Sequence, residues 1–153
     1  MQISKCSRKN WQDWHWQLKN RITRPEITGL VSSKSAAELE ALKQTASVYP
    51  LAITPYYFSL IDQKNENDPI KKQCFPDPRE IITTQSSDDP LEEDSYMPVP
   101  KLVHRFPDRC LALVTETCAT YCRHCNRKRF WSAPGKLSLK KRLLQMIHYI
   151  SAS

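Results

Sequence analysis

The sequence predicts an α/β fold in which a helical amino-terminal region precedes the first strand–loop–helix unit of an incomplete TIM-type barrel. Three observations lead to this prediction: capped segments with helical spacing up to residue 75, a short apolar run at 110–114, and a second helical pattern from 139 to 150. We therefore expect residues 1–75 to form the helical region, 76–100 a connector, and 101–153 the start of the barrel.

The first predicted helix covers residues 11–22. Trp11, Trp14 and Ile22 fall on one stripe of a helix, because residues three, four or seven apart share a face. Asn10 precedes the pattern and is a residue type that commonly caps a helix amino terminus. We expect one continuous helix that packs its aromatic side chains against the following segments.

Capping residues mark the next three helix starts. Ser35 and Glu38 have the spacing of a capping box, and the helix that they open should end before Pro50. Thr54 and Asp68 are each followed by a proline, and a capping residue before a first-turn proline is a typical helix start. The region up to residue 75 is therefore expected to be a small, mainly helical region.

The remaining elements follow from composition and periodicity. Between 76 and 100, prolines alternate with aspartates and glutamates, which is typical of an extended surface connector. The run CLALV at 110–114 predicts a strand buried on both faces of a parallel sheet. Ser138 can cap a final helix that has one apolar face, formed by Leu139, Leu143, Met146, Ile147 and Ile150.

Length and charge exclude several classes of protein. With 153 residues the chain is shorter than a complete barrel of about 200 residues or more. It has no apolar run that spans a bilayer and no signal-peptide pattern, so we expect a cytoplasmic protein without a membrane partner. The net charge of +7 has no nucleic-acid motif beside it, so we expect a basic face near an anion site and no nucleic-acid partner.

Cysteine spacing is the most specific chemical signal. Six cysteines without a secretion signal argue against disulfides, and Cys118, Cys122 and Cys125 have the spacing C-x3-C-x2-C. Three thiolates can hold three irons of a four-iron cluster and leave the fourth iron with an open coordination position. The alternative is a zinc site completed by Cys110 or His124, which the spacing favours less because structural zinc sites use paired cysteine knuckles.

The sequence segments around the cysteines indicate a more specific family. The chain contains LVHRFPDRCLALVTETCATYCRHCNRKRF and, upstream and in this order, WQDWHWQLKNRI, ITPYYFSLID, DPIKKQC and DPLEE. Through these segments, from residue 11 to 150, it resembles the amino-terminal part of the lysine 2,3-aminomutase family of radical S-adenosylmethionine (SAM) enzymes. The resemblance implies a radical SAM partial barrel and an isomerase that converts L-lysine to β-lysine.

The resemblance also implies cofactors and site residues. The cofactors are a [4Fe-4S] cluster on the three motif cysteines, SAM, and pyridoxal 5'-phosphate (PLP), and the partners are a reductant such as flavodoxin or ferredoxin and further copies of the full-length protein. His124 would lie against SAM. Arg127 would bind the carboxylate of the substrate, a task that suits the planar fork of guanidinium. Arg105 and Arg109 would lie near PLP and balance its phosphate charge.

The resemblance leaves part of the family pattern without a counterpart. The glycine-rich segment that contacts SAM and the lysine that binds PLP have no matching sequence here, so no Schiff-base lysine is assigned. We therefore expect a truncated or split gene product that is inactive alone and prone to aggregate, because Leu139, Leu143 and Ile147 would have little to pack against.

Several other functions stay open at this point. One is the related enzyme that supplies β-lysyl groups to a translation elongation factor, and others are glutamate or arginine aminomutases. From a different class, the chain could be a small zinc-bound nucleic-acid module that uses its basic tail. A brown, iron-containing protein would exclude the zinc module, whereas a colourless protein with stoichiometric zinc would favour it.

Overall fold

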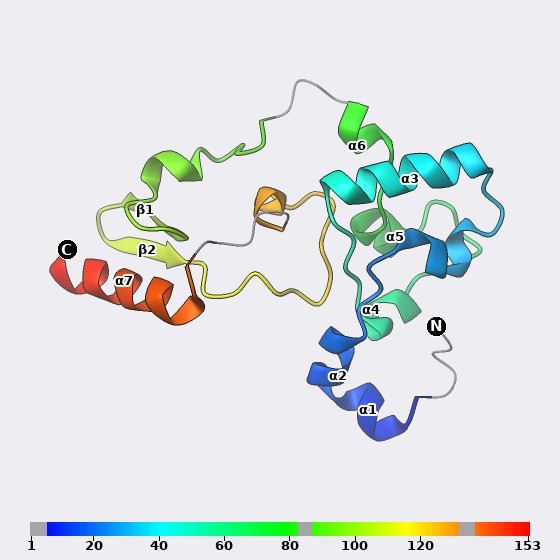
Figure 1. Cartoon of the computed structure of the whole chain (residues 1–153), viewed down its shortest axis with the longest axis horizontal. Coiled ribbons are helices and arrows are strands. Elements are labelled where there is room, and N and C mark those ends of the chain that lie inside the picture. The colour runs from blue at the N-terminus through cyan, green and yellow to red at the C-terminus, as the bar shows by residue number, and fades with distance from the viewer. Residues whose placement is uncertain (1–5, 83–86, 132–136) are drawn as a thin grey trace.

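The computed structural model describes residues 6–82, 87–131 and 137–153. Helices α1 to α6 lie in one half of the molecule, and a hairpin with the final helix α7 lies in the other (Figure 1). The α-helices and strands are α1 (Arg8–Gln12), α2 (Trp14–Lys19), α3 (Ala36–Val48), α4 (Pro55–Ser59), α5 (Pro69–Cys74), α6 (Arg79–Ile82), β1 (Leu102–Phe106), β2 (Arg109–Ala112) and α7 (Leu139–Ala152), and short 3-10 helices lie at Pro25–Ile27, Gly29–Val31, Glu93–Tyr96 and Lys128–Phe130.

Local capping signals correctly predict most helix starts. The Ser35 hydroxyl accepts a hydrogen bond from the Glu38 backbone N–H, and the Glu38 carboxylate accepts one from the Ser35 N–H, so the capping box of α3 is complete. Thr54, Asp68 and Ser138 likewise cap α4, α5 and α7. These starts are predictable because each depends on a few neighbouring residues.

The prediction of one helix over residues 11–22 is wrong. Asp13 ends α1 and caps α2, where its carboxylate accepts from the His15 N–H at 2.9 Å. A short carboxylate side chain competes with the helical backbone for N–H groups, which explains the break. The expected cap is also wrong, because Ser7 rather than Asn10 caps the first helix.

The strand–loop–helix order is confirmed, but the predicted nature of the strand is wrong. β2 pairs antiparallel with β1, and Phe106 and Arg109 face each other across the turn at Pro107 and Asp108. β2 is largely exposed rather than buried on both faces. An apolar run looks the same in sequence whether it forms a buried parallel strand or an exposed antiparallel one. Here the preceding segment, β1, folds back and pairs with it.

The core lies in the helical half. Ile53, which is fully buried, exchanges backbone hydrogen bonds with Ile22 and so joins the segment after α2 to the segment before α4. The buried cluster around it draws on α3, α4, α5 and their connections: Ile22, Leu30, Val31, Leu42, Leu51, Ile53, Phe58, Ile61, Cys74 and Phe75. The apolar contacts of the chain therefore concentrate upstream of the cysteine motif.

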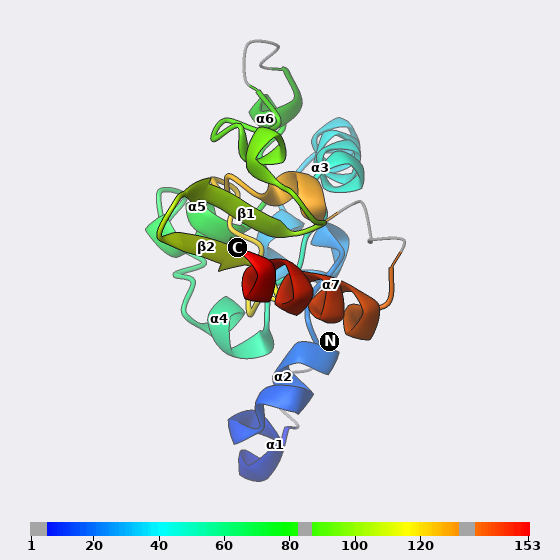
Figure 2. The ribbon, with the colours of Figure 1, turned by 90° about the vertical axis from the view of Figure 1, so that its left-hand side faces the viewer.

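Helix α7 lies alongside the hairpin (Figure 2), where the His104 ring nitrogen and the Tyr149 hydroxyl are 2.8 Å apart. Met146 is 2% exposed, but Leu139 and Ile147 are 52% and 59% exposed. The expectation that Leu139, Leu143 and Ile147 have little to pack against is confirmed for Leu139 and Ile147, whereas Leu143 is half-buried. None of the helices that the structure describes is long and apolar enough to span a membrane.

Candidate iron-sulfur and cofactor site

The segment after β2 that carries Cys118, Cys122 and Cys125, called the cysteine loop, crosses from β2 to the helical half and runs along it (Figure 1). Backbone N–H groups of Tyr121 and Arg123 donate to the carbonyls of Ala52 and Gln73, at 2.8 and 2.7 Å. The Thr54 N–H donates in the other direction, to the Ala119 carbonyl at 2.9 Å. The helical half therefore provides the surface that holds the cysteine loop.

A side chain inside the motif anchors the loop. Arg123 is buried, its guanidinium forms a 2.8 Å ion pair with Glu80 of α6, and it also donates to the carbonyls of Tyr49 and Pro50. An arginine that is paired with a carboxylate and two carbonyls has most of its donors satisfied, which compensates for its burial. Sequence reasoning missed Arg123 and Glu80. The signal that could have pointed to Arg123 is its position inside the cysteine motif, between Cys122 and Cys125.

The three motif cysteines lie on the same loop. The Cys125 N–H donates to the Cys122 carbonyl at 2.9 Å, which closes a turn between them. Burial, and secondly the nearby thiols of Cys125 and Cys122, raise the pKa of Cys118, while Arg21 opposes this effect. All three are free thiols. Cys122 and Cys125 are thus near enough to Cys118 to influence its pKa.

N–H donors point at the motif sulfurs. The amide nitrogen of Gln73 lies 3.5 Å from the sulfur of Cys122, and the backbone N–H of Arg127 lies 3.4 Å from that of Cys125. Hydrogen bonds of this kind stabilise thiolates and are a feature of iron-sulfur sites. This donor set fits an iron-sulfur cluster.

The geometry does not match a single-ion site. Within the described ranges, no group of three or more His, Cys, Asp and Glu side chains is placed to hold one metal ion. In a cubane each thiolate binds its own iron, so the sulfurs need not converge on one point. The choice between a cluster and a zinc ion completed by Cys110 or His124 rests on the spacing C-x3-C-x2-C, because structural zinc sites use paired cysteine knuckles.

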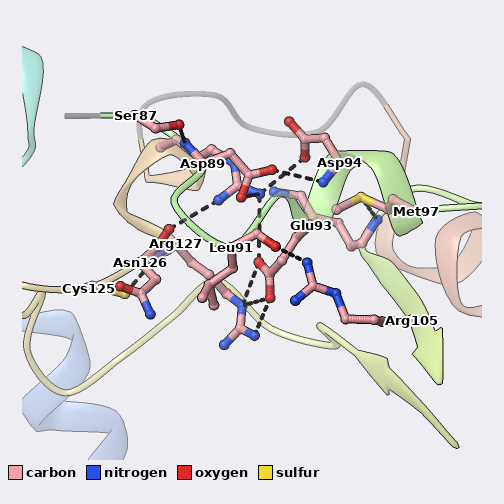
Figure 3. Close-up of polar contacts among 12 residues, drawn as sticks. Ser87, Asp89, Leu91, Glu93, Asp94, Met97, Arg105, Cys125, Asn126 and Arg127 are labelled. Atoms are coloured by element: carbon pink, nitrogen blue, oxygen red, sulfur yellow. Dashed lines mark hydrogen bonds and ion pairs between the residues drawn. The ribbon is translucent and has the colours of Figure 1, made fainter. Parts of the chain in front are cut away.

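Arg127 is held by a buried glutamate of the segment before β1 (Figure 3). Its Nε and Nη2 atoms face the two oxygens of Glu93, and the shortest distance is 2.5 Å. The Glu93 side chain is 5% exposed and that of Arg127 is 34% exposed. Arg129 also contacts this carboxylate, at 3.6 Å, and pairs with Asp89 at 3.1 Å. The segment 76–100, expected as an extended connector, therefore contributes a buried carboxylate to the site.

Arg105 and Arg109 line one cavity of about 240 Å³, together with Glu93. The guanidinium of Arg105 lies 4.5 Å from the centre of the Tyr96 ring and donates to the Leu91 carbonyl. That of Arg109 lies 4.3 Å from the Phe106 ring centre. Aromatic contacts of this kind restrict where a guanidinium points. Glu93 is thus shared between the cavity and the Arg127 pair.

His124 is separate from this cavity. It is exposed and borders a different hollow of about 380 Å³, beside Arg123 and Glu80. The structure therefore groups the predicted arginines around Glu93, groups the cysteines on the loop, and places His124 on the side of the loop that faces α6. Glu93 and Gln73 are further site residues that sequence reasoning missed.

Comparison with known proteins places this site in a wider context. No family model matches the chain. It is 43% identical over 149 residues, or 97% of its length, to the L-lysine 2,3-aminomutase of Acetoanaerobium sticklandii, and 42% identical over 142 residues to that of Clostridium subterminale. It is also 34% identical over 150 residues to the glutamate 2,3-aminomutase of Clostridioides difficile. The chain spans about a third of the length of these relatives, 34–36%.

Proposed function

Because the chain belongs to the lysine 2,3-aminomutase family, we propose that it carries the cluster loop and part of the cofactor and substrate site of a radical SAM, PLP-dependent aminomutase. β2, the cysteine loop and α7 would begin its partial barrel. L-lysine is the proposed substrate, since the lysine enzymes share 43% and 42% identity with the chain and the glutamate enzyme 34%. Aminomutases are isomerases, and the proposed reaction moves an amino group from the α to the β carbon.

The observation that carries this proposal is the cysteine loop with N–H donors aimed at its sulfurs. Cys118, Cys122 and Cys125 would each bind one iron, and the fourth iron would have an open position for SAM. When bound, the cluster, SAM and PLP supply the radical chemistry of the amino shift. The chain positions these groups, and its Arg123 anchor to Glu80 keeps the ligand loop in one shape.

Arg127 is proposed to bind the substrate carboxylate. Glu93 occupies the Nε and Nη2 edge of the guanidinium. A substrate carboxylate would use the other edge, which includes Nη1, because the planar fork offers two bidentate edges. Glu93 would then orient Arg127, and the shared contact with Arg129 would keep this carboxylate in place.

Arg105 and Arg109 are proposed to bind the phosphate of PLP. Both line the cavity next to Glu93, and their charge suits a phosphate group that carries about two negative charges at neutral pH. His124 is proposed to contact SAM from the exposed side of the loop. A flavodoxin or ferredoxin is the proposed electron donor.

Anaerobic reconstitution with iron and sulfide tests the proposal. We expect a brown chain that contains iron and sulfide and has an electron paramagnetic resonance (EPR) signal on reduction, and added SAM should change this signal. Cys118→Ala, Cys122→Ala and Cys125→Ala should each lose the cluster, whereas Cys110→Ala, at an exposed cysteine outside the motif, should retain it. A colourless chain with stoichiometric zinc would overturn the proposal.

A further inference from the structure

Gln73, in the last turn of α5, contacts the cysteine loop through both its backbone and its side chain. Its carbonyl accepts the Arg123 N–H at 2.7 Å, and its amide nitrogen lies 3.5 Å from the sulfur of Cys122. Its amide oxygen accepts a hydrogen bond of 2.5 Å from the hydroxyl of Tyr57 in α4. Two helices far upstream of the motif thus contribute one hydrogen-bond chain that ends on a proposed cluster ligand.

If Cys122 binds iron, the hydrogen bonds that link Tyr57, Gln73 and Cys122 can have only one direction, from Tyr57 to Gln73 and from Gln73 to Cys122. A cysteine bound to iron has lost its proton, so its sulfur only accepts hydrogen bonds. The Gln73 amide must then turn its NH₂ group toward Cys122 and its oxygen away, and that oxygen needs a donor. Tyr57 is that donor. Burial, and secondly the nearby Cys74 and Cys122, raise the pKa of Tyr57, so its hydroxyl retains the proton that it donates.

Gln73 differs from the other donor in this site. The N–H that faces Cys125 belongs to the backbone of Arg127, so any non-proline residue would supply it. Within the described part of the chain, Gln73 is the side chain that donates to a motif sulfur. The hydrogen bond to Cys122 therefore depends on residue identity, and a single substitution removes it.

We propose, on the basis of the proposed function, that Gln73, oriented by Tyr57, is a positioning residue that hydrogen-bonds the Cys122 thiolate and raises the reduction potential of the cluster. Reduction adds negative charge that is shared with the cysteine sulfurs. An N–H dipole aimed at a sulfur stabilises that charge, and hydrogen bonds to cluster sulfurs are among the factors that set the potential. The effect is strengthened because the donor is half-buried between α5 and the loop.

The test is a potentiometric EPR titration of the reconstituted chain and its variants. Gln73→Leu removes the donor at similar volume and should shift the potential to more negative values. Gln73→Glu places a carboxylate against the sulfur and should shift it further in the same direction. Tyr57→Phe removes the group that orients the amide and should produce a smaller negative shift with a changed EPR line shape. Gln44→Leu, at an exposed position of α3, is the matched control and should leave the potential unchanged.

The possible outcomes separate this inference from the function on which it depends. If the unmodified chain binds no iron and sulfide, the proposed function fails and the inference fails with it. If the unmodified chain binds a cluster and Gln73→Leu, Gln73→Glu and Tyr57→Phe all keep its potential and line shape, only the inference is overturned. Loss of the cluster from Gln73→Leu, with circular dichroism like that of the unmodified chain, would support a positioning role. The reduction potential would then be measured on Tyr57→Phe, which should still show a negative shift.

Discussion

In the helical half, buried side chains form one apolar cluster that runs from Ile22 to Phe75. In the unit formed by β1, β2 and α7, named here the hairpin–α7 unit, few apolar side chains are fully covered; Leu102 and Met146 are at most 2% exposed. Charged pairs connect the segments that flank this unit to α7: Glu116, in the loop after β2, contacts Lys101, just before β1, at 3.4 Å and Arg142 of α7 at 2.8 Å. The two halves thus differ in how much apolar surface they bury.

This difference explains how the cysteine loop is held. The loop follows the hairpin in sequence, but Arg123 and the backbone at Tyr121 bind the helical half. Its shape therefore depends on the better-packed part of the molecule, because apolar burial supplies most of the favourable free energy of folding. The helices that precede the strand are part of the proposed cluster site.

The sharpest test of this view is Arg123→Ala. This change should leave Glu80 buried without its partner and detach the loop from the helical half, so we expect the free energy of unfolding to fall by about 3–5 kcal/mol. Urea denaturation followed by circular dichroism measures it. Lys43→Ala is the control, because Lys43 forms an exposed 3.9 Å pair with Glu40 that should contribute less than about 1 kcal/mol. Equal effects of the two changes would contradict the anchoring role of Arg123.

A matched pair of isoleucines compares the two halves directly. Ile53 is 0% exposed in the helical core, whereas Ile147 is 59% exposed on α7. We expect Ile53→Ala to lower the free energy of unfolding by about 2–5 kcal/mol, since it leaves a cavity, and Ile147→Ala by no more than about 0.5 kcal/mol. Thermal and urea unfolding of both variants measure the difference. A large loss for Ile147→Ala would mean that α7 packs more firmly than its exposure indicates.

Short-range features of the fold were predictable from sequence. Ser35 and Asp68 begin helices where the sequence places them, because capping depends on residues within one turn. The break at Asp13 was missed since apolar spacing continues across it. The antiparallel pairing of residues 109–112 was missed because an apolar run does not show which strand will pair with it.

For the site, spacing alone grouped Cys118, Cys122 and Cys125. The residues that support them were not predictable in the same way: the Arg123 to Glu80 pair joins positions 43 apart, and the Arg127 to Glu93 pair joins positions 34 apart. Such contacts arise from tertiary packing, on which local patterns carry no information. The resemblance named Arg127 but not the glutamate that holds it.

The buried thiol of Cys74 should make the stability of the helical half depend on pH. Burial raises its pKa from 9.0 to about 12. In the unfolded chain the thiol loses its proton first as the pH rises above 9.0, so alkali favours unfolding by about 1.4 kcal/mol per pH unit up to the folded pKa. Below the unfolded pKa this effect vanishes.

Unfolding measured below and above pH 9.0 tests this dependence. Other groups titrate in the same range, so the quantity to compare is the slope of each variant against that of the unmodified chain. Cys74→Ala should have a shallower slope, whereas Cys110→Ala, at an exposed cysteine of β2, should keep the original slope. An unchanged slope in Cys74→Ala would mean that the thiol is not buried in the folded chain.

The smallest expected difference between the two halves lies in their helix caps. Ser35 forms a complete capping box on α3, whereas the Ser138 hydroxyl accepts a single long bond of 3.4 Å from the Lys141 N–H of α7. We expect Ser35→Ala to lower the free energy of unfolding by about 1 kcal/mol and Ser138→Ala by about 0.5 kcal/mol. Urea denaturation of the two variants under one set of conditions measures the difference. A larger loss for Ser138→Ala would show that α7, despite its exposed apolar face, contributes more to the folded state than its contacts indicate, because a cap stabilises the protein only as far as its helix is coupled to the rest.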